Sequence, residues 1–300
     1  MIIMKFKRII SLLLAACMIM ALSATAFAAG EGDERTVIGA DLDEKEIGQV
    51  YKTFGIDRGS VTELTVTNAE EREYLNGLVD SDVIGTRSIS CVYIKVLGEG
   101  QGLDVSTSNI TWCTKEINSN ALVTAGINDA KIIVTAPIDV SGTAALTGIY
   151  KAYENITGTK LDETAKAVGT EEMVVTSELA EEIGSYDATL IVNEIKLMLD
   201  QLDNYTDEQL HDEIVRICGE YNVTLNEDQI AQIISLARKL QKMSNSELLK
   251  HVQTLQTKLK DLAGVIDKAR TAEEKTHTFF ENIGSFFSSI VDFFKSIFNS

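Results

Sequence analysis

The chain has a single proline, Pro137, among its 300 residues, whereas proline usually makes up about 5% of a protein. Proline-rich linkers are therefore excluded, and long uninterrupted helices are favoured. Histidine is also scarce: His211, His251 and His277 all follow residue 210 and share no metal-binding spacing. The first 210 residues therefore cannot form a Ser-His-Asp or Cys-His catalytic site by themselves, and we expect no metal or other cofactor.

Four cysteines are too few for a disulfide-rich scaffold. One of them, Cys17, lies within residues 1–28, which have a basic start, an apolar stretch and the small-x-small site Ala26-Phe27-Ala28 typical of a secretory signal peptide. A lipoprotein modified at Cys17 is an alternative, but the apolar stretch continues past this residue and favours ordinary cleavage. An uncleaved anchor is a third interpretation, although the stretch is short for a span. We therefore expect a secreted or otherwise extracytoplasmic protein.

The other three cysteines, Cys91, Cys113 and Cys218, are an odd number. Cys91 and Cys113 could pair outside the cell. However, a hairpin that turns at Gly98–Gly102 places Cys91 opposite Asn109 and not opposite Cys113. Buried thiols are therefore favoured over a disulfide.

Basic residues are outnumbered, with 27 against 45 acidic ones. Three of the 27 lie in residues 1–28, which leaves 24 in the remainder and a net charge of −21. This charge disfavours nucleic acid as a partner and disfavours direct attraction of the body to anionic lipid. The acidic residues concentrate in 154–228, whereas 229–275 are net basic. Solvated faces are the favoured interpretation, since exposed ion pairs contribute little each; the alternative is that the basic helices pack beside the acidic ones.

Apolar periodicity predicts an α+β fold, in which a mixed sheet covered by helices is followed by an all-α region with a long C-terminal helix. In residues 35–157 the order is β-α-β-α-β-β-α-β-α, and Asp43 with Glu46 forms a capping box for the first helix. Thr67 or Asn68 begins the second helix, and Thr114 begins the one before the last strand. The predicted strands are 35–39, 61–67, 88–97, 103–108 and 131–136.

The stretch Val134–Gly148 joins the sheet to the helices. Pro137 has no N–H and is expected to end the last strand. One residue of Ser141-Gly142-Thr143 then caps a helix that runs to about Asn155. On this helix small residues share one face, which allows close packing on the sheet: Ser141, Ala145, Gly148 and Ala152.

No strand pattern follows Thr157. Residues 158–243 predict a helical bundle, with Gly158, Gly169 and Gly184 separating one or two short helices at its start. Residues 244–300 predict a long helix that Ser244 and Glu247 open. Its apolar residues follow heptad spacing, typical of pairing within the chain or between chains: Leu248, Val252, Leu255, Leu259, Leu262, Ile266 and Ala269.

The segment 276–300 is rich in phenylalanine, and small polar residues occupy its other face. Its charged residues make a membrane span unlikely to form. Three interpretations stay open: contact with a membrane interface, docking on the bundle, and pairing with another copy to form a homo-oligomer. The predicted contact residues are Phe279, Phe280, Phe286, Phe287, Phe294 and Phe298.

Two sets of residues are candidates for chemistry. Asp139, Ser141, Gly142 and Thr143 follow a strand and open a helix, as in an anion-binding loop. They lack the Gly-Lys-Ser/Thr ending of a phosphate loop, and capping with close packing is the alternative. Aspartates near strand ends are the second set, since two of them could act as acid and base, although such aspartates are usually turn residues: Asp41, Asp43, Asp82, Asp104 and Asp139. We assign no catalytic residue.

Seven segments together resemble one known family: Gly39–Leu42, Thr65–Asn68, Ile84–Arg87, Asn120–Gly126, Val134–Gly148, Val175–Leu179 and Asn222–Leu225. The family they resemble is the YpuA-like family of secreted bacterial proteins, domain of unknown function 1002. The resemblance implies export and a similar chain length, and it transfers no catalytic residue.

The sequence predicts an exported, non-catalytic cell-envelope protein that binds or scaffolds, with membrane or partner contact through residues 276–300. A cell-wall hydrolase using paired carboxylates is the alternative.

Overall fold

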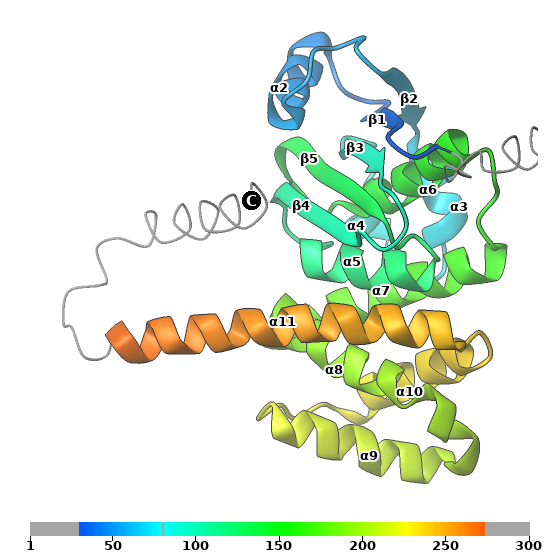
Figure 1. Cartoon of the computed structure of the whole chain (residues 1–300), viewed down its shortest axis with the longest axis vertical. Coiled ribbons are helices and arrows are strands. Elements are labelled where there is room, and N and C mark those ends of the chain that lie inside the picture. Colours follow the sequence, from blue (N-terminus) through cyan, green and yellow to red (C-terminus); the bar gives the residue numbers. More distant parts are fainter. Residues whose placement is uncertain (1–29, 80, 274–300) are drawn as a thin grey trace, which may run out of the picture.

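The computed structural model of the chain describes residues 30–79 and 81–273, and it describes side chains as far as residue 261 (Figure 1). The predicted signal peptide, residues 1–28, and the predicted contact segment, residues 276–300, lie outside the described residues. The described chain is α+β, because a five-stranded mixed sheet with helices is followed by a helical region.

The sheet region follows the predicted order of elements. Its first helix begins at the predicted capping box of Asp43 with Glu46. Of the two predicted starts of the second helix, Thr67 and Asn68, Thr67 is the cap, and it forms a capping box with Glu70. The elements are β1 (Glu34–Gly39), α2 (Glu44–Phe54), β2 (Thr62–Val66), α3 (Asn68–Leu75), α4 (Ser81–Ile84), β3 (Cys91–Val96), β4 (Leu103–Ile110), α5 (Lys115–Thr124), β5 (Ala130–Val140) and α6 (Thr143–Thr157).

The strand order in the sheet is β2-β1-β3-β5-β4, and only β3 runs antiparallel to its neighbours. The predicted hairpin of β3 and β4 is therefore wrong, because β5 lies between them. β5 carries Ile132 and Val134, both 0% exposed. Because the strand is this apolar, a central position with a neighbouring strand on each edge stabilises it. β4 alternates exposed and half-buried residues and forms an edge.

None of the three described cysteines forms a disulfide. Cys91 lies opposite Thr135 of β5, not opposite Asn109. Cys91, Cys113 and Cys218 are all free and buried, as predicted. Burial raises the pKa of the Cys91 thiol to about 12, so this thiol is protonated and unreactive near neutral pH.

Pro137 does not end β5, contrary to the prediction. Thr135 pairs with Ser108 of β4, and the next pair is Val140 with Ile110, so the ladder is irregular between them. The missing N–H of Pro137 falls in this irregular segment, where no regular ladder bond needs it. The side chain of Asn109 donates to the carbonyl of Ala136 at 2.8 Å and thereby satisfies a group that the bulge leaves unpaired.

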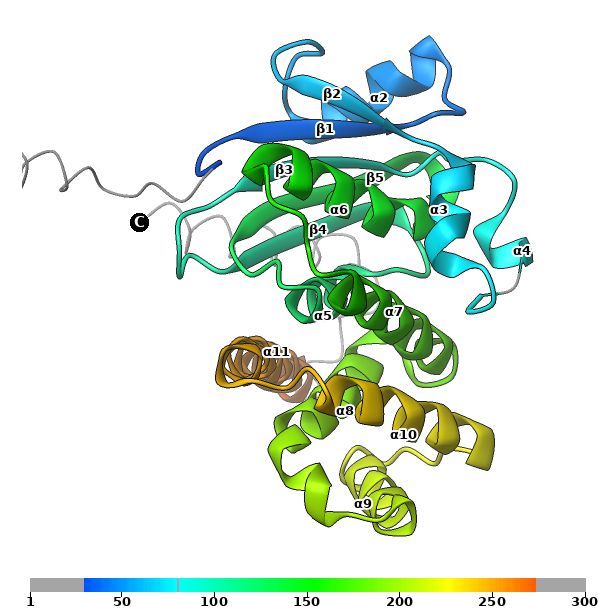
Figure 2. The ribbon, with the colours of Figure 1, turned by 90° about the vertical axis from the view of Figure 1, so that its right-hand side faces the viewer.

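Helices cover both faces of the sheet (Figure 2). α2 packs on one face, where its Phe54 joins a core cluster with Ile38 and Tyr93. α5 and α6 pack on the other face against a larger cluster that includes Val37. A Cβ placed on Gly148 of α6 would lie 3.3 Å from Val37, so the predicted small-residue face does allow close packing.

The helical region begins with one long helix rather than two short ones. Gly169 lies in its middle and does not end it, because a Cβ there would come within 2.7 Å of the carbonyl oxygen of Ala121 on α5. The glycine is required by this helix crossing. The elements are α7 (Glu163–Ile183), α8 (Ser185–Leu197), the 3₁₀ helix η1 (Leu199–Asn204), α9 (Asp207–Glu220), α10 (Glu227–Gln241) and α11 (Ser246–Glu273).

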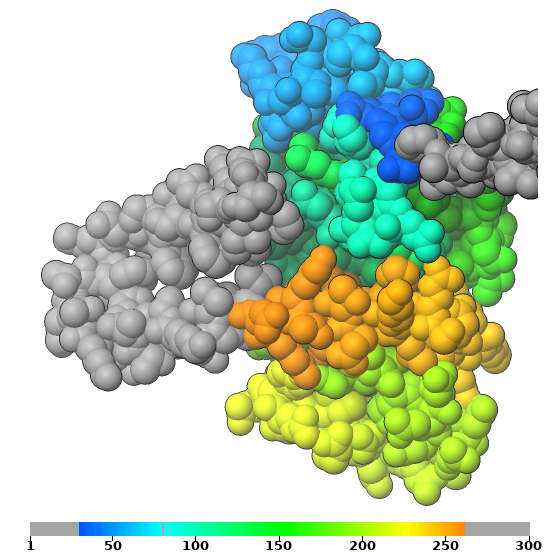
Figure 3. Space-filling view, in the orientation of Figure 1, coloured from blue at the N-terminus to red at the C-terminus, as the bar shows by residue number. Residues whose placement is uncertain are grey.

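α11 lies as a band between the sheet region and α9, seen in orange in Figure 3. Asn245, and not Ser244, caps it, since its Oδ1 accepts from the amide of Leu248 at 2.9 Å. Leu248, Val252 and Leu259 are 7%, 0% and 5% exposed. The described half of the heptad pattern is therefore buried within the chain, against α8 and α5.

Basic residues of the later helices lie beside acidic residues of the earlier ones, which agrees with the alternative interpretation and not with the favoured one. Lys239 of α10 contacts Glu171 of α7 at 2.7 Å, and Arg238 contacts Asp207 of α9 at 2.9 Å. These pairs are partly exposed, so each contributes little to stability, at most about 1 kcal/mol.

Candidate functional site

A cavity of about 320 Å³ lies where β5 leads into α6. Its walls come from α3 through Glu71, from the chain between α4 and β3, and from Val140, Ser141, Thr143 and Ala144. β1, β2, β4 and β5 are parallel to one another, and the cavity lies at the edge where β5 ends. In sheets of this kind, ligands bind beyond the carboxyl ends of the strands.

Glu71 is the most unusual residue of the cavity, since it is a carboxylate that is only 1% exposed. Its Oε2 accepts from Asn68 at 3.2 Å, whereas its Oε1 has no hydrogen-bond partner among the described residues. Burial raises the pKa of this carboxyl group, and the nearby Thr143 hydroxyl, Asn68 amide and Arg72 charge act against that rise. An unpartnered buried polar atom costs about 1–3 kcal/mol.

The amino terminus of α6 forms the facing wall. Gly142 precedes it with φ +91°, and a Cβ there would lie 2.5 Å from Cγ2 of Ile110, so both backbone and space require glycine. No side chain caps the helix. The first amides of a helix lack intrahelical acceptors, and together with the helix dipole they attract negative charge.

The chain from Gly85 to Ser90 completes the cavity and is held by hydrogen bonds to Arg72 and Asp41, which lie outside this segment. Arg72 donates to the carbonyl of Gly85 at 2.6 Å. Arg87 donates to the carbonyl of Asp41 at 2.7 Å, and the carboxylate of Asp41 accepts from the amide of Ser88 at 2.7 Å. Two guanidinium groups therefore stand at this wall, and Arg87 itself lines the cavity.

The four predicted ligand residues divide between the cavity and its surroundings. Ser141 and Thr143 line it, with their hydroxyl oxygens 3.2 Å apart, and Gly142 makes the turn between them. Asp139 is exposed on β5 and does not line the cavity.

Glu71 is not among the predicted site residues. Its neighbour Glu70 closes the capping box with Thr67. Glu71 therefore has no capping role and lies on the buried side of α3.

The predicted strand-end aspartates lie at separate places. Asp43 caps α2, and Asp41 holds Ser88. Asp104 lies at the start of β4 opposite Lys131, whereas the cavity is at the far end of β5, opposite Ile110. Among the residues that line the cavity, Glu71 is the one carboxylate.

The structure describes residues 30–79 and 81–273. Within this range, no three or more His, Cys, Asp or Glu side chains are grouped so that they could hold a metal ion. None of the helices in the same range combines the length and apolar character that crossing a bilayer requires.

A second buried carboxylate lies at the contact of α5, α7 and α8. Glu172 and Lys196 are both 0% exposed and form an ion pair at 2.7 Å. Thr124 donates to the other oxygen of Glu172, and Lys196 also contacts Thr124 at 2.9 Å and Asn120 at 3.3 Å. Burial raises the pKa of Glu172 and lowers that of Lys196, with each partner opposing the shift of the other. Both oxygens of Glu172 are thus satisfied from within the protein.

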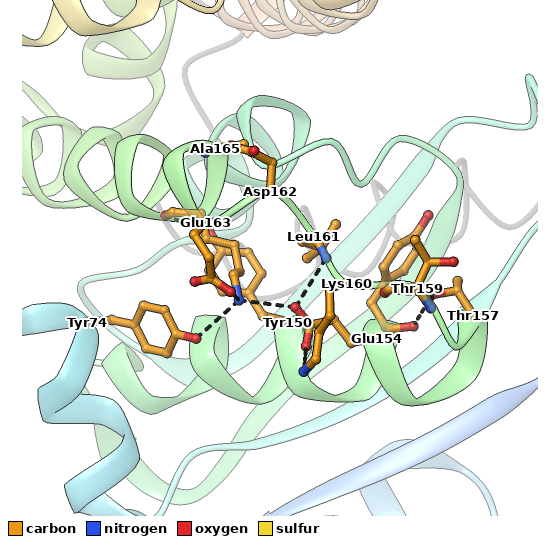
Figure 4. Close-up of polar contacts among 12 residues, drawn as sticks. Tyr74, Tyr150, Glu154, Thr157, Thr159, Lys160, Leu161, Asp162, Glu163 and Ala165 are labelled. Atoms are coloured by element: carbon orange, nitrogen blue, oxygen red, sulfur yellow. Dashed lines mark hydrogen bonds and ion pairs between the residues drawn. The ribbon is translucent and has the colours of Figure 1, made fainter.

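A third charged cluster joins α3, α6 and α7 (Figure 4). Lys166 is 3% exposed and contacts Glu154 at 3.0 Å and Glu163 at 2.7 Å. Its ammonium group also lies 5.6 Å from the centre of the Tyr74 ring. Hydrogen bonds to the two glutamates raise the pKa of Lys166 despite its desolvation. This cluster links the three helices. Lys166 has its ion-pair partners, Glu154 and Glu163, within the chain.

Trp112, the chain's one tryptophan, connects the cavity to the helical region. Its amide donates to the carbonyl of Ser141 at 3.3 Å, and its indole N–H donates to Glu181 of α7 at 2.8 Å. The hydroxyl of Ser177 approaches its carbonyl at 3.4 Å. Tryptophan fluorescence is therefore a direct reporter of changes next to the cavity.

Comparison with known proteins identifies the family of this chain. Residues 38–262 match the family model described as Protein of unknown function (DUF1002), which is well over half of the chain. The chain belongs to this family. It is similar to the uncharacterized protein YpuA of Bacillus subtilis (strain 168), with 40% identity over 215 residues, 71% of this chain and 73% of YpuA. No solved structure matches the chain.

Proposed function

We propose that this chain is an exported, non-catalytic binding protein of the cell envelope, and that its ligand site is the cavity between α3 and the amino terminus of α6. The observation that carries the proposal is that Glu71 lines this cavity and that its buried Oε1 has no hydrogen-bond partner among the described residues. Other buried side chains of the described residues, such as Asn193, also have an unpartnered polar atom, but among the residues that line this cavity Glu71 is the one that does. A ligand that reaches it supplies the missing hydrogen bond.

Two further features support a binding role. The cavity volume falls at the small end of the range for ligand pockets, about 300–1,000 Å³. Its polar groups converge from segments far apart in the sequence, since Glu71 and Thr143 are 72 positions apart. A cell-wall hydrolase would need two facing carboxylates, and the lining residues include one, Glu71.

Ligand binding is tested with the full-length mature chain and a panel of inorganic phosphate, acetate, glycerol phosphate and N-acetylglucosamine. Trp112 fluorescence and the thermal midpoint are the measurements. We expect at least one compound to give a saturable change that Ala144→Leu abolishes, because leucine at this lining position fills the cavity. Ala231→Leu, at an exposed position of α10, is the matched control. If no compound binds, or if both variants behave alike, the cavity is not the site.

The second part of the proposal rests on the sequence, since residues 276–300 lie outside the described residues. We propose that their phenylalanine-rich pattern contacts a membrane surface. Liposome flotation of the mature chain is compared with that of a version ending at Lys275. The full chain should float and the shorter one should not; equal flotation, or none, removes this part.

A further inference from the structure

α11 extends beyond the part of the molecule to which it is bound. Its Gln256 donates to the carbonyl of Leu190 of α8 at 3.2 Å. The hydroxyl of Tyr186, also on α8, donates to the carbonyl of Leu259. The helix continues to Glu273, and Figure 1 shows that its carboxyl-terminal end projects past the sheet region and past the other described helices. Helices are stabilised mainly by packing against other elements, so this end of α11 is a surface for a partner.

The contact of α11 within the chain does not follow the heptad pattern of its sequence. The heptad pattern has Leu255 between Val252 and Leu259, but Gln256 is the residue that the contact buries. Leu255 is half-buried, whereas Gln256 is 1% exposed and its Oε1 has no hydrogen-bond partner among the described residues. A straight helix drifts from a seven-residue repeat by about 20° per heptad, so packing on α5 and α8 does not by itself explain the repeat.

The heptad pattern continues into the projecting end, where residues 262–273 form about 18 Å of helix. Its apolar positions there are Leu262, Ile266 and Ala269. Apart from Arg270, the positions that flank this seam hold small or apolar residues. A seven-residue repeat is typical of helices that pack side by side along their length, so the sequence specifies another helix as the partner. The small or apolar flanking residues are Ala263, Val265 and Ala272.

The charge of the projecting end favours a second copy as that partner. The whole chain has a formal net charge of −18, so two copies repel each other. Residues 262–273, by contrast, contain two basic and two acidic residues and are neutral. Two copies can therefore meet at this segment with little repulsion between the segments themselves. A second copy also carries the same heptad pattern, so the chain itself supplies the helix that the pattern requires.

We propose that residues 262–273 of α11 pair with the same segment of a second copy of this chain and form a short coiled coil. Leu262, Ile266 and Ala269 form the shared seam. The seam covers fewer than two heptads, so the dimer is a weak one that dissociates on dilution. This surface is separate from the cavity and from residues 276–300, and the pairing requires neither a ligand nor a membrane.

The test is analytical ultracentrifugation of the full mature chain, and of the version ending at Lys275, over a range of protein concentrations. Both should form the dimer, because the paired segment ends before Lys275. Ile266→Glu places a charge in the middle of the apolar seam and should weaken the dimer by about tenfold or more. Thr271→Glu is the matched control. It places the same charge at the heptad position farthest from the seam and should change the dissociation constant by less than about threefold.

Three results would overturn the proposal. The first is a monomer at every concentration. The second is a dimer that is lost in the version ending at Lys275, since residues 276–300 would then hold it. The third is a dimer that Ile266→Glu and Thr271→Glu affect alike. Circular dichroism checks that Ile266→Glu keeps its helix content. If it does not, Leu262→Glu takes its place as the seam variant and is judged by the same comparison with Thr271→Glu.

Discussion

Glu71 and Glu172 are both glutamates within helices, both almost fully buried, and both have a raised carboxyl pKa caused first by burial. They differ in their partners. Glu172 has Lys196 and Thr124, one for each oxygen. Glu71 lines a cavity and has Asn68 for one oxygen, and its other oxygen has no hydrogen-bond partner among the described residues. The first arrangement completes a core, and the second leaves a donor or acceptor for something outside the chain.

The comparison teaches that burial of a charged residue does not by itself indicate function. A buried group with a complete set of partners holds elements together, here α5, α7 and α8. A buried group with an incomplete set at an open cavity is a site candidate. The predictions below separate the two cases by stability and by binding.

The largest effect is expected from breaking the completed pair. Lys196→Met leaves the Glu172 carboxyl group buried without its ammonium partner and should lower the free energy of unfolding by about 3–5 kcal/mol. The double variant Lys196→Met with Glu172→Leu removes both charges and should recover most of this loss. Urea denaturation measures both. A double variant as unstable as the single one would contradict the assignment of a charged pair.

A smaller effect of opposite sign is expected at Asn193 of α8. This side chain is 0% exposed, and neither of its polar atoms has a hydrogen-bond partner among the described residues. It is not among the residues that line the cavity with Glu71, and Asn193→Leu should raise the free energy of unfolding by about 1 kcal/mol. Thermal unfolding provides the measurement. A loss of stability of similar size would show that the amide has a partner, such as a buried water.

Substitution of Glu71 by glutamine should change how the free energy of unfolding depends on pH, with little effect at acidic pH. The folded state raises this pKa above its ordinary value of 4.5, so the folded chain binds the proton more tightly than the unfolded chain. Its stability therefore falls as the pH rises from about 4.5 to the folded pKa, and remains lower above it. Glu71→Gln does not titrate, so its stability relative to the unsubstituted chain should increase across this window. Denaturation at pH 4 and pH 7 tests this; an equal difference at both values would contradict it.

The smallest effect is expected from a surface pair that belongs to neither case. Lys239 and Glu171 lie 2.7 Å apart, and Lys239 is 46% exposed. Lys239→Ala should change the free energy of unfolding by less than about 0.5 kcal/mol, and the change should shrink further in high salt. Chemical denaturation at two salt concentrations checks both statements. A loss above 1 kcal/mol would indicate a network and not an isolated pair.

Local signals in the sequence predicted the order of elements and most helix starts, because capping boxes such as Asp43 with Glu46 act within one turn. Pairing between distant segments was not predictable in the same way. The placement of β5 between β3 and β4, and the continuation of β5 through Pro137, depend on burial from both faces and on a bulge. The role of Gly169 depends on a helix, α5, that lies more than 40 positions earlier.

The candidate site was half predictable for the same reason. Ser141, Gly142 and Thr143 stand together in the sequence, between a strand and a helix, so a local pattern reveals them. Glu71 comes from α3, and nothing in its local sequence distinguishes it from Glu70. Only the folded chain brings Glu71 to Thr143.

The placement of β5 also governs the sequence of events by which the chain can fold. β3 and β4 precede β5 in the sequence, yet each pairs with it and not with the other. During synthesis from the amino terminus, β1, β2 and β3 can pair with one another. β4 has no strand to pair with until residues 130–140, which form β5, have been made. The sheet is completed only by these pairings between distant segments, which form slowly, so a chain cut before residue 130 lacks the strand that joins β3 to β4.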